Sequence, residues 1–269
     1  MNRFLVIGGT GVAGTAAIKA IREHFGDGAH VTVVWYGRKF EELTIGGADT
    51  VLFGDVSDPA TFDQVEAASG RRFDGAFYAT AMGEVGFPSH MATAEQIAQS
   101  NVLSFDPLPV IEERFDVGMS VSYSTFYNLP HQRVTYGAMA HSKAALEAWT
   151  LEPGKSRRAC IRAGAFKSGS SQAIKLLVRR NAAKLAAMDD PILKEAFSGT
   201  KASEAVENLQ QAVFDEEREF FGDTGTDEDG LVAAHLLLFA TPEARFVCVS
   251  GKKVWLDDNA QEAPPVAAG

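Results

Sequence analysis

Two side chains with acid–base capability, Tyr136 and Lys143, stand seven positions apart. Seven residues is close to two turns of an α-helix, so the spacing predicts that both side chains lie on one face of a helix. A phenol beside an ammonium group can give a proton to a reacting oxygen and stabilise negative charge on it. Met139 stands between them, and aromatic residues and methionines at helical spacing are also typical of core packing. Acid–base chemistry and simple packing are therefore both open readings of this segment.

A glycine-rich stretch near the amino end has the spacing of a phosphate-binding turn. Gly9, Gly11 and Gly14 form a G-x-G-x-x-G pattern after a short apolar run and before a helix predicted over residues 12–25. The first glycine permits a tight turn, the second lets a pyrophosphate approach the backbone, and the third lets helix and strand pack closely. The N–H groups at the start of the helix favour phosphate, although a plain structural turn is the alternative. The residues expected to contact the dinucleotide here are Gly8, Thr10, Gly11 and Val12.

The end of the second apolar run indicates which dinucleotide is bound. A protein that prefers NAD places Asp or Glu there for the ribose 2′-hydroxyl, whereas this chain has Arg38 followed by Lys39. Both can attract a 2′-phosphate, so we expect NADPH, with two surface charges on a loop as the alternative. Asp55, after the third run, could accept from the adenine amino group or form an ordinary turn. Ala79, at the end of the fourth run, completes the expected cofactor contacts at this edge.

Seven apolar runs have the length and composition of buried strands, and helical segments separate most of them. Continuous apolar strands alternating with helices indicate a parallel sheet that is covered on both faces. The sequence therefore predicts one Rossmann-like, doubly wound α/β domain over residues 1–269, with its ligand crevice at the carboxyl ends of the strands. The runs are residues 4–7, 31–35, 50–53, 73–79, 117–123, 158–162 and 246–249.

Two segments differ from this alternation. Residues 169–230 form a long stretch with a helical pattern between the last two strands, and an excursion of this length on the crevice side is expected to be a substrate lid. Residues 257–269 are rich in Ala, Pro and acidic side chains, so a frayed, flexible tail is expected there.

The bulk composition restricts the partners and the location. The chain has a formal net charge of −10, which disfavours binding to nucleic acid and to anionic membrane surfaces. No stretch approaches the roughly 20 apolar residues of a membrane span, so a soluble, cytoplasmic protein is expected. The two cysteines lie in apolar runs and fit a reducing compartment. The six histidines lack metal-ligand spacing, and no metal site is predicted.

These features together resemble the short-chain dehydrogenase/reductase family, and the resemblance covers nearly the whole chain. The pattern Gly8-x-x-Gly11-x-x-Gly14 is similar to that of extended and atypical members. The family's Tyr-x-x-x-Lys motif is where the chain departs, because Lys143 is present but Met139 stands where the tyrosine is expected.

The arrangement Tyr136-x-x-Met139-x-x-x-Lys143 is instead similar to the enoyl-acyl carrier protein reductase branch of that family. This branch also has Ser-Tyr at the end of the fifth strand, matched here by Ser122-Tyr123. The resemblance implies that Lys143 holds the nicotinamide ribose and that Tyr123, with Ser122, lines the substrate side of the same site.

Two further segments take roles from the resemblance. Asn101 is similar to the helix asparagine that relays protons in other members, with an ordinary polar helix residue as an equal alternative. The segment Arg162–Ser168 resembles the loop whose backbone clasps the carboxamide and whose hydroxyl residue contacts the phosphates. Phe166 and Ser168 are the cofactor contacts expected from it. The family's proline is missing from this loop, so a looser loop is expected.

The position of the acid bears on the substrate. In a conjugated enone the oxygen lies two carbons further from the hydride acceptor than in a ketone, and placing the phenol at Tyr136 shifts the acid by about one helical turn. The sequence thus favours reduction of an activated C=C bond. Reduction of a ketone or imine with Tyr136 or Tyr123 as the donor is an alternative. A non-catalytic NADPH-binding sensor is an alternative of another class, prompted by Met139.

The expected partner is a small-molecule substrate, which the resemblance extends to a thioester on coenzyme A or acyl carrier protein. A basic helix in the lid segment would meet that acidic carrier, although a solvated face neutralised by nearby acids is the simpler reading. Homo-oligomers occur in the family, and the early Pro153 makes the helix that builds their interface short here. The basic residues are Lys175, Arg179, Arg180 and Lys184.

Overall fold

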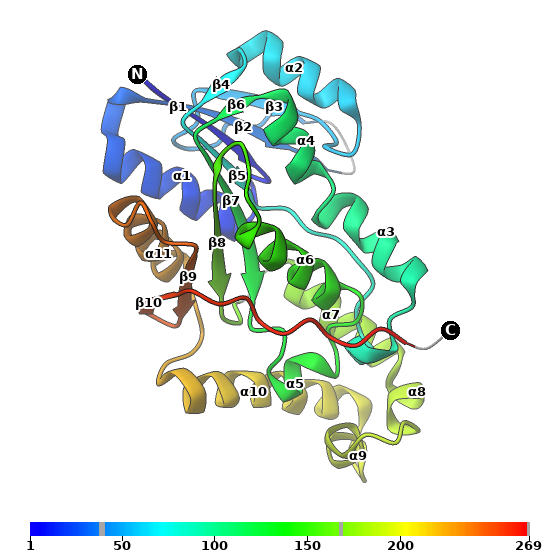
Figure 1. Ribbon diagram of the computed structural model, residues 1–269. Coiled ribbons are helices and arrows are strands. Elements are labelled where there is room, and N and C mark those ends of the chain that lie inside the picture. Colours follow the sequence, from blue (N-terminus) through cyan, green and yellow to red (C-terminus); the bar gives the residue numbers. More distant parts are fainter. Residues whose placement is uncertain (38–40, 167–168, 268–269) are drawn as a thin grey trace.

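The computed structural model describes residues 1–37, 41–166 and 169–267, and at its centre is an eight-stranded sheet (Figure 1). The strand order is β3-β2-β1-β5-β7-β8-β9-β10, and every neighbouring pair is parallel except β9 with β10. This is the doubly wound order, so the predicted fold class is confirmed. The strands are β1 (Asn2–Ile7), β2 (Ala29–Trp35), β3 (Thr50–Phe53), β5 (Gly75–Tyr78), β7 (Met119–Thr125), β8 (Arg157–Ala163), β9 (Phe246–Ser250) and β10 (Lys253–Asp257).

The predicted apolar runs all lie in strands, with two differences. The fourth and fifth runs each begin with a separate short strand, β4 (Arg72–Phe73) and β6 (Asp116–Val117), and these two pair with each other in parallel. The antiparallel β10 was not predicted, because its residues are half-buried or exposed and so give no continuous apolar run.

Alternating residues of the strands enter two separate cores, one on each face of the sheet. On one face the core contains Phe4 and Val6 together with side chains of α1 and α11. On the other face it contains Leu5 and Ile7 with side chains of α2, α4 and α6. The period-2 alternation of a strand places successive side chains on opposite faces, so both faces must be covered. The covering helices are α1 (Val12–Phe25), α2 (Pro59–Ser69), α3 (Ala94–Ser104), α4 (Pro107–Arg114), α6 (Met139–Leu151) and α11 (Glu228–Ala240).

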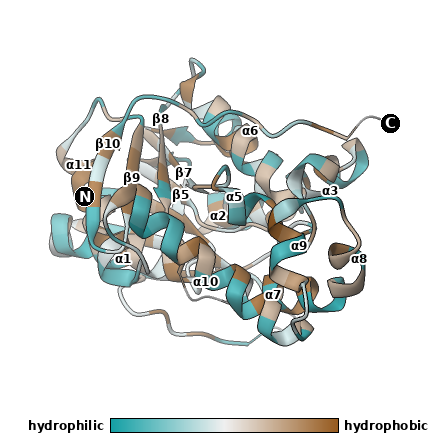
Figure 2. Ribbon diagram, turned by 90° about the horizontal axis from the view of Figure 1, so that it is seen from below, coloured by the Kyte–Doolittle hydropathy of each residue, from teal (hydrophilic) through white to brown (hydrophobic). Residues whose placement is uncertain are grey.

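The segment after β8 folds into a helical group beyond the carboxyl ends of the strands, in the lower part of Figure 1. Figure 2 views the molecule from this side and shows α7, α9 and α10 with hydrophilic and hydrophobic residues mixed along them. The group has its own apolar core, to which Val178, Leu193 and Leu209 belong. Its helices are α7 (Gly169–Arg180), α8 (Ala182–Ala186), α9 (Pro191–Phe197) and α10 (Ala202–Phe221), with α5 (Pro130–Arg133) packed against α10. Two single-turn 3₁₀ helices, η1 (Gly26–Gly28) and η2 (Ser89–Met91), complete the described elements. None of the helices in the described ranges is both long and apolar enough to cross a membrane.

The residues after β10 lie along the molecule and do not project from it, which differs from the frayed tail that the composition suggested. In Figure 1 the red carboxyl-terminal segment passes α6 toward α3. The main-chain N–H of Gln261 donates to the buried carboxylate of Glu147 at 2.7 Å, and its carbonyl accepts from the Tyr127 hydroxyl at 3.1 Å. The N–H of Ala267 reaches the carbonyl of Ala92 at 3.2 Å. Hydrogen bonds to the body of the protein therefore fix a segment that cannot bury much apolar surface of its own.

Candidate active site

The glycine turn after β1 is packed between neighbouring strands. Gly8 has a φ of +80°, and a Cβ there would lie 2.8 Å from the carbonyl oxygen of Ala79. The left-handed residue of the turn is thus Gly8, whereas the sequence pattern assigned the tight turn to Gly9. Gly9 is required for a different reason, because its Cβ would lie 2.3 Å from a methyl carbon of Val33. Gly14 has the predicted packing role, since its Cβ would lie 2.3 Å from the Gly8 carbonyl oxygen.

The amino end of α1 is left open for an anion. Gly11 is the N-cap residue and offers no side-chain acceptor, and the first turn of this 14-residue helix contains no acidic residue. A Cβ on Gly11 would meet only the Gly8 carbonyl oxygen, at 3.4 Å, among the described atoms. Thr10 is exposed and Val12 half-buried at the rim of the turn. Free N–H groups, a positive helix end and missing side-chain bulk fit the pyrophosphate of a dinucleotide.

The expected adenosine end is only partly described. Arg38 and Lys39 lie outside the described residues. The Asp55 carboxylate accepts from the backbone N–H and the hydroxyl of Ser57, at 2.9 and 2.7 Å, which is the ordinary turn alternative. At the same edge the ring of Tyr36, which is 62% exposed, stacks on Phe53 with centroids 5.5 Å apart. Neither residue of this aromatic pair was among the expected cofactor contacts.

Lys143 lies on α6 and is held at the carboxyl end of β7. Its Nζ atom donates a 2.8 Å hydrogen bond to the main-chain carbonyl oxygen of Tyr123. The side chain is buried, and this desolvation lowers the pKa of Lys143 to about 8. A buried ammonium group with one acceptor among the described residues retains N–H donors that can donate to a ligand hydroxyl.

Tyr136 does not lie on α6, so the predicted helix face shared with Lys143 is wrong. The helix begins at Met139, and Gly137 turns the chain before it with a φ of +50°. A Cβ at Gly137 would lie 2.6 Å from the carbonyl oxygen of Glu84, so this turn is restricted to glycine. The spacing of seven could not reveal a left-handed residue within the segment.

Tyr136 is nevertheless buried beside the helix that carries Lys143. It packs in one cluster with Ala140 and Ala144 of α6, which lie three positions before and one position after Lys143. Burial raises the pKa of the Tyr136 phenol, so it stays protonated through neutral pH. No hydrogen bond of its hydroxyl to another described residue occurs, which leaves the proton available. The other members of the cluster are Val85, Tyr127 and Met139, with Ala81, Ile174 and Leu177 packed against them.

The structure places neither Ser122 nor Tyr123 in the expected substrate-lining role. The Tyr123 side chain enters the core on the α1 and α11 face, where its hydroxyl lies 2.6 Å from His235 Nε2. Ser122 points to the opposite face but is completely buried, and its hydroxyl donates to the Ala159 carbonyl at 3.5 Å. Strand alternation within β7 explains the correction, because position 123 shares a face with position 121 and not with the site.

Asn101 is brought against α6 but not to Lys143. Its side-chain oxygen accepts from the Ser142 hydroxyl at 2.8 Å, and no bond to Lys143 exists among the described residues. The nearby Met139 sulfur lies 3.5 Å from the Ser100 hydroxyl, so Met139 is turned toward α3. These contacts fit the reading of Asn101 as a polar packing residue between α3 and α6.

The loop after β8 is attached on two sides. The N–H of Gly164 donates to the Val249 carbonyl at 2.7 Å, and the N–H of Ala165 donates to the Glu217 carboxylate at 2.6 Å. Phe166 packs against the core cluster to which Val12 and Ala79 also pack. Ser168 lies outside the described residues. Glu217 and Tyr127 were missed by the sequence analysis, because a Glu in an acidic helix and a Tyr in a turn carry no distinguishing signal.

The basic helix is only partly neutralised by its neighbours. Lys175 pairs with Glu207 of α10 at 2.8 Å. Arg179 and Arg180, at the end of α7, are exposed. Lys184 is exposed too, but it lies on the separate helix α8, so the predicted single basic helix is divided in two.

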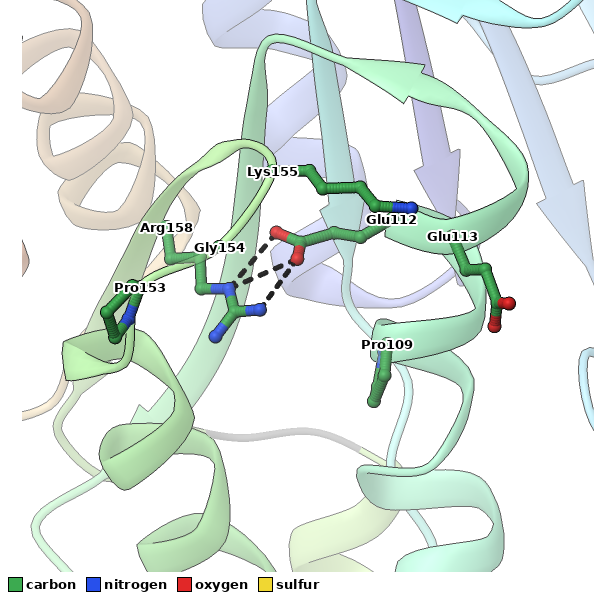
Figure 3. A pocket seen from close by; sticks show the side chains of 7 residues that line it. All are labelled: Pro109, Glu112, Glu113, Pro153, Gly154, Lys155 and Arg158. Atoms are coloured by element: carbon green, nitrogen blue, oxygen red, sulfur yellow. Dashed lines mark hydrogen bonds and ion pairs between the residues drawn. The ribbon is translucent and has the colours of Figure 1, made fainter.

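A hollow of about 460 Å³ lies at the opposite end of the sheet from the candidate site around Lys143 (Figure 3). Its wall includes Arg158, which pairs with Glu112 at 2.8 Å and also donates to the Trp149 carbonyl. Arg158 and Glu112 are thus partnered with each other, and the position of the hollow before β8 is not the end where parallel sheets bind ligands. In the described ranges no three His, Cys, Asp or Glu side chains gather in a way that could hold a metal ion.

Comparisons with known proteins place the fold. No protein-family model and no curated protein matches the chain. The KRED1-Pglu enzyme is 18% identical, with a TM-score of 0.57 over 90% of this chain and 97% of its own. A short chain dehydrogenase family protein from Francisella tularensis is 16% identical, with a TM-score of 0.57 over 93% and 98%. A small-chain dehydrogenase in complex with NADPH is 14% identical, with a TM-score of 0.55 over 93% and 97%. At these identities the likeness shows the fold alone: the chain has the fold of the short-chain dehydrogenases.

Proposed function

We propose that this protein is an NADPH-dependent oxidoreductase of the short-chain dehydrogenase/reductase type that reduces a small molecule. The observation that carries the proposal is Tyr136, a buried side chain that packs beside the helix of Lys143 and whose hydroxyl has no hydrogen-bond partner among the described residues. The open end of α1 lies at the same edge of the sheet, because parallel strands end together there. The NADPH bound to one of the structural neighbours is consistent with this cofactor.

The groups that would hold NADPH are the turn around Gly8 and Gly11 at the pyrophosphate, Arg38 with Lys39 at the 2′-phosphate, and Lys143 at the nicotinamide ribose. Bound NADPH would supply the hydride. In this arrangement the protein contributes binding and orientation through backbone N–H groups, and charge through its cations.

The chain also contributes a proton donor and a site from which water is excluded. Tyr136 donates its proton, or a hydrogen bond, to the oxygen on which negative charge develops. The ammonium group of Lys143 stabilises that charge from a buried position, where electrostatic interactions are stronger than in water. Ile174 and Leu177 of α7 cover the apolar cluster around Tyr136, in keeping with a lid that excludes water.

The substrate class proposed is an activated C=C bond conjugated to a carbonyl, either a free enone or a thioester on coenzyme A or acyl carrier protein. The acid is Tyr136 and not residue 139, and the apolar side chains around it suit an uncharged unsaturated group. Reduction of a ketone or imine with Tyr136 as donor is the second candidate. Tyr123 is removed as a donor because its hydroxyl is bonded to His235 on the other face.

NADPH oxidation with enones, enoyl thioesters, ketones and imines tests the proposal. Consumption limited to conjugated substrates supports C=C reduction, and consumption limited to ketones or imines moves the assignment to the second candidate. Binding of NADPH without turnover of any compound would leave a sensor, the non-catalytic alternative. If calorimetry detects binding of neither NADPH nor NADH, the proposed function is rejected.

A further inference from the structure

Helix α10 carries two adjacent carboxylates that bind opposite sides of the candidate site. Glu217 is 1% exposed, and its Oε1 atom accepts the 2.6 Å hydrogen bond from the Ala165 N–H in the loop after β8. Its Oε2 atom accepts from the hydroxyls of Thr224 and Ser250, at 3.2 and 3.4 Å. The bond to Ala165 is short and charge-assisted, so it is among the stronger attachments that a loop can have.

The neighbouring Glu216 binds α5, on the other side of the candidate site. One carboxylate oxygen accepts from the main-chain N–H of His131 at 3.1 Å, and the other lies 2.6 Å from the His131 ring. His131 belongs to α5, which immediately precedes the turn that carries Tyr136. One helix therefore binds both the loop expected at the nicotinamide and the segment that leads to the candidate acid.

The residue types in the loop after β8 leave room for the Glu217 carboxylate. A Cβ on Gly164 would lie 2.7 Å from Glu217 Oε2, so the absence of a side chain there gives the carboxylate room. Ala165 provides an N–H that a proline at that position would lack. On its other side the loop is fixed to β9 through Val249, so removal of Glu217 frees one flank only.

We propose that Glu217 is a positioning residue for cofactor binding, which fixes the loop 164–166 to α10 so that NADPH binding and the docking of α10 support each other. The inference rests on the proposed function and deepens it. Glu217 does not touch the cofactor itself; it acts through the Ala165 main chain. Energetic coupling of this kind is reciprocal, so NADPH must in turn stabilise the attachment of α10.

The first test measures NADPH affinity by fluorescence titration at a temperature at which each variant is folded. Glu217→Leu removes the acceptor, and we expect the Kd to rise at least about tenfold, equivalent to one lost charge-assisted hydrogen bond. Glu217→Gln keeps an oxygen for the Ala165 N–H and should stay within about threefold of wild type. Glu217→Asp has a side chain one methylene shorter, and its Kd for NADPH should lie between those of the Gln and Leu variants. Glu219→Gln, at an exposed position of the same helix, is the matched control.

The second test needs no cofactor chemistry. Amide hydrogen exchange of Ala165 should be slow in wild type and in Glu217→Gln, and markedly faster in Glu217→Leu. NADPH should slow exchange along residues 202–221 in wild type and have a smaller effect there in Glu217→Leu. If Glu217→Leu does not fold, Glu217→Asp takes its place in both measurements.

The outcomes separate this inference from the proposed function. Wild-type protein that binds neither pyridine nucleotide rejects both. Wild-type protein that binds NADPH while Glu217→Leu and Glu217→Asp bind it within twofold, with unchanged Ala165 exchange, overturns the role of Glu217 and leaves the function standing. Equal losses in the Gln and Leu variants would also overturn it, because the acceptor oxygen is the proposed cause.

Discussion

Lys143 Nζ donates its 2.8 Å hydrogen bond to the main-chain oxygen of Tyr123, while the phenol of the same tyrosine faces the opposite side of the sheet. The backbone of Tyr123 therefore belongs to the candidate site and its side chain does not. Tyr123 and Tyr136 are both buried phenols in one chain, and only Tyr136 has a hydroxyl without a described hydrogen-bond partner. They form a natural matched pair for mutagenesis.

Replacement of Tyr136 with Phe should lower kcat/KM by about 10²- to 10⁴-fold with little change in NADPH affinity, because it removes a proton donor and leaves the packing intact. Tyr123→Phe is the control: it should leave kcat/KM within a few-fold and reduce stability by about 1 to 3 kcal/mol, since His235 loses its partner. Steady-state kinetics and urea unfolding measure both. A reversed pattern would transfer the chemistry to Tyr123.

The pH dependence should reflect Lys143. Desolvation lowers its pKa to about 8, so the ammonium form is lost as the pH rises through that value. We expect kcat/KM to be level below about pH 8 and to fall above it. For stability the sign is opposite: the unfolded chain binds more protons between about pH 8 and the ordinary value of 10.5, so stability rises with pH there. Both features should be missing in Lys143→Met, and an unchanged profile would contradict the assignment.

Addition of a side chain at Gly11 should affect the ligand more than the fold. Its φ is −85°, and its Cβ position meets only one described atom, so Gly11→Val should keep the melting temperature within a few degrees. The valine would occupy the space that the pyrophosphate needs, and NADPH affinity should fall at least about tenfold. Gly28→Ala, where an added Cβ meets nothing within 4 Å, is the control and should bind normally. Equal affinity of both variants would argue against a phosphate at this turn.

The buried ion pair of Glu147 with Arg162 should dominate stability on the α6 face. Both side chains are almost inaccessible, and the carboxylate also accepts from the Ser124 hydroxyl. Glu147→Leu removes the fully buried partner of the guanidinium and leaves it only the partly exposed carboxylate of Asp257, at 2.7 Å. We expect a cost of roughly 3 to 5 kcal/mol in denaturant unfolding. Asp189→Ala breaks an exposed pair with Lys194 and should leave the free energy of unfolding nearly unchanged, because solvent screens the pair. Similar losses in the two variants would show that burial does not decide the effect.

The elements that the sequence could predict are those with a local signal. The helix over 12–25 and the seven apolar strands follow from periodicity and from glycines at fixed spacing, and the structure has them at nearly the same bounds. The same local rules place the glycine turn at the carboxyl end of β1.

The parts that could not be predicted depend on conformations and contacts without a local signal. The left-handed φ of Gly137 separates Tyr136 from α6 although the spacing is that of a continuous helix. The face to which Tyr123 points depends on strand register, and a shift of one residue reverses it. Glu217 meets Ala165 across 52 positions of sequence, which no pattern within either segment indicates.

The attachment of the carboxyl-terminal segment has a consequence for the order of folding. Gln261 joins Glu147 and Tyr127 across 114 and 134 positions, so these bonds can form only after the sheet and α6 are assembled. Loop-closure entropy makes such distant contacts late events. We therefore expect the segment to dock late in folding, and to cover the Glu147–Arg162 ion pair when it does.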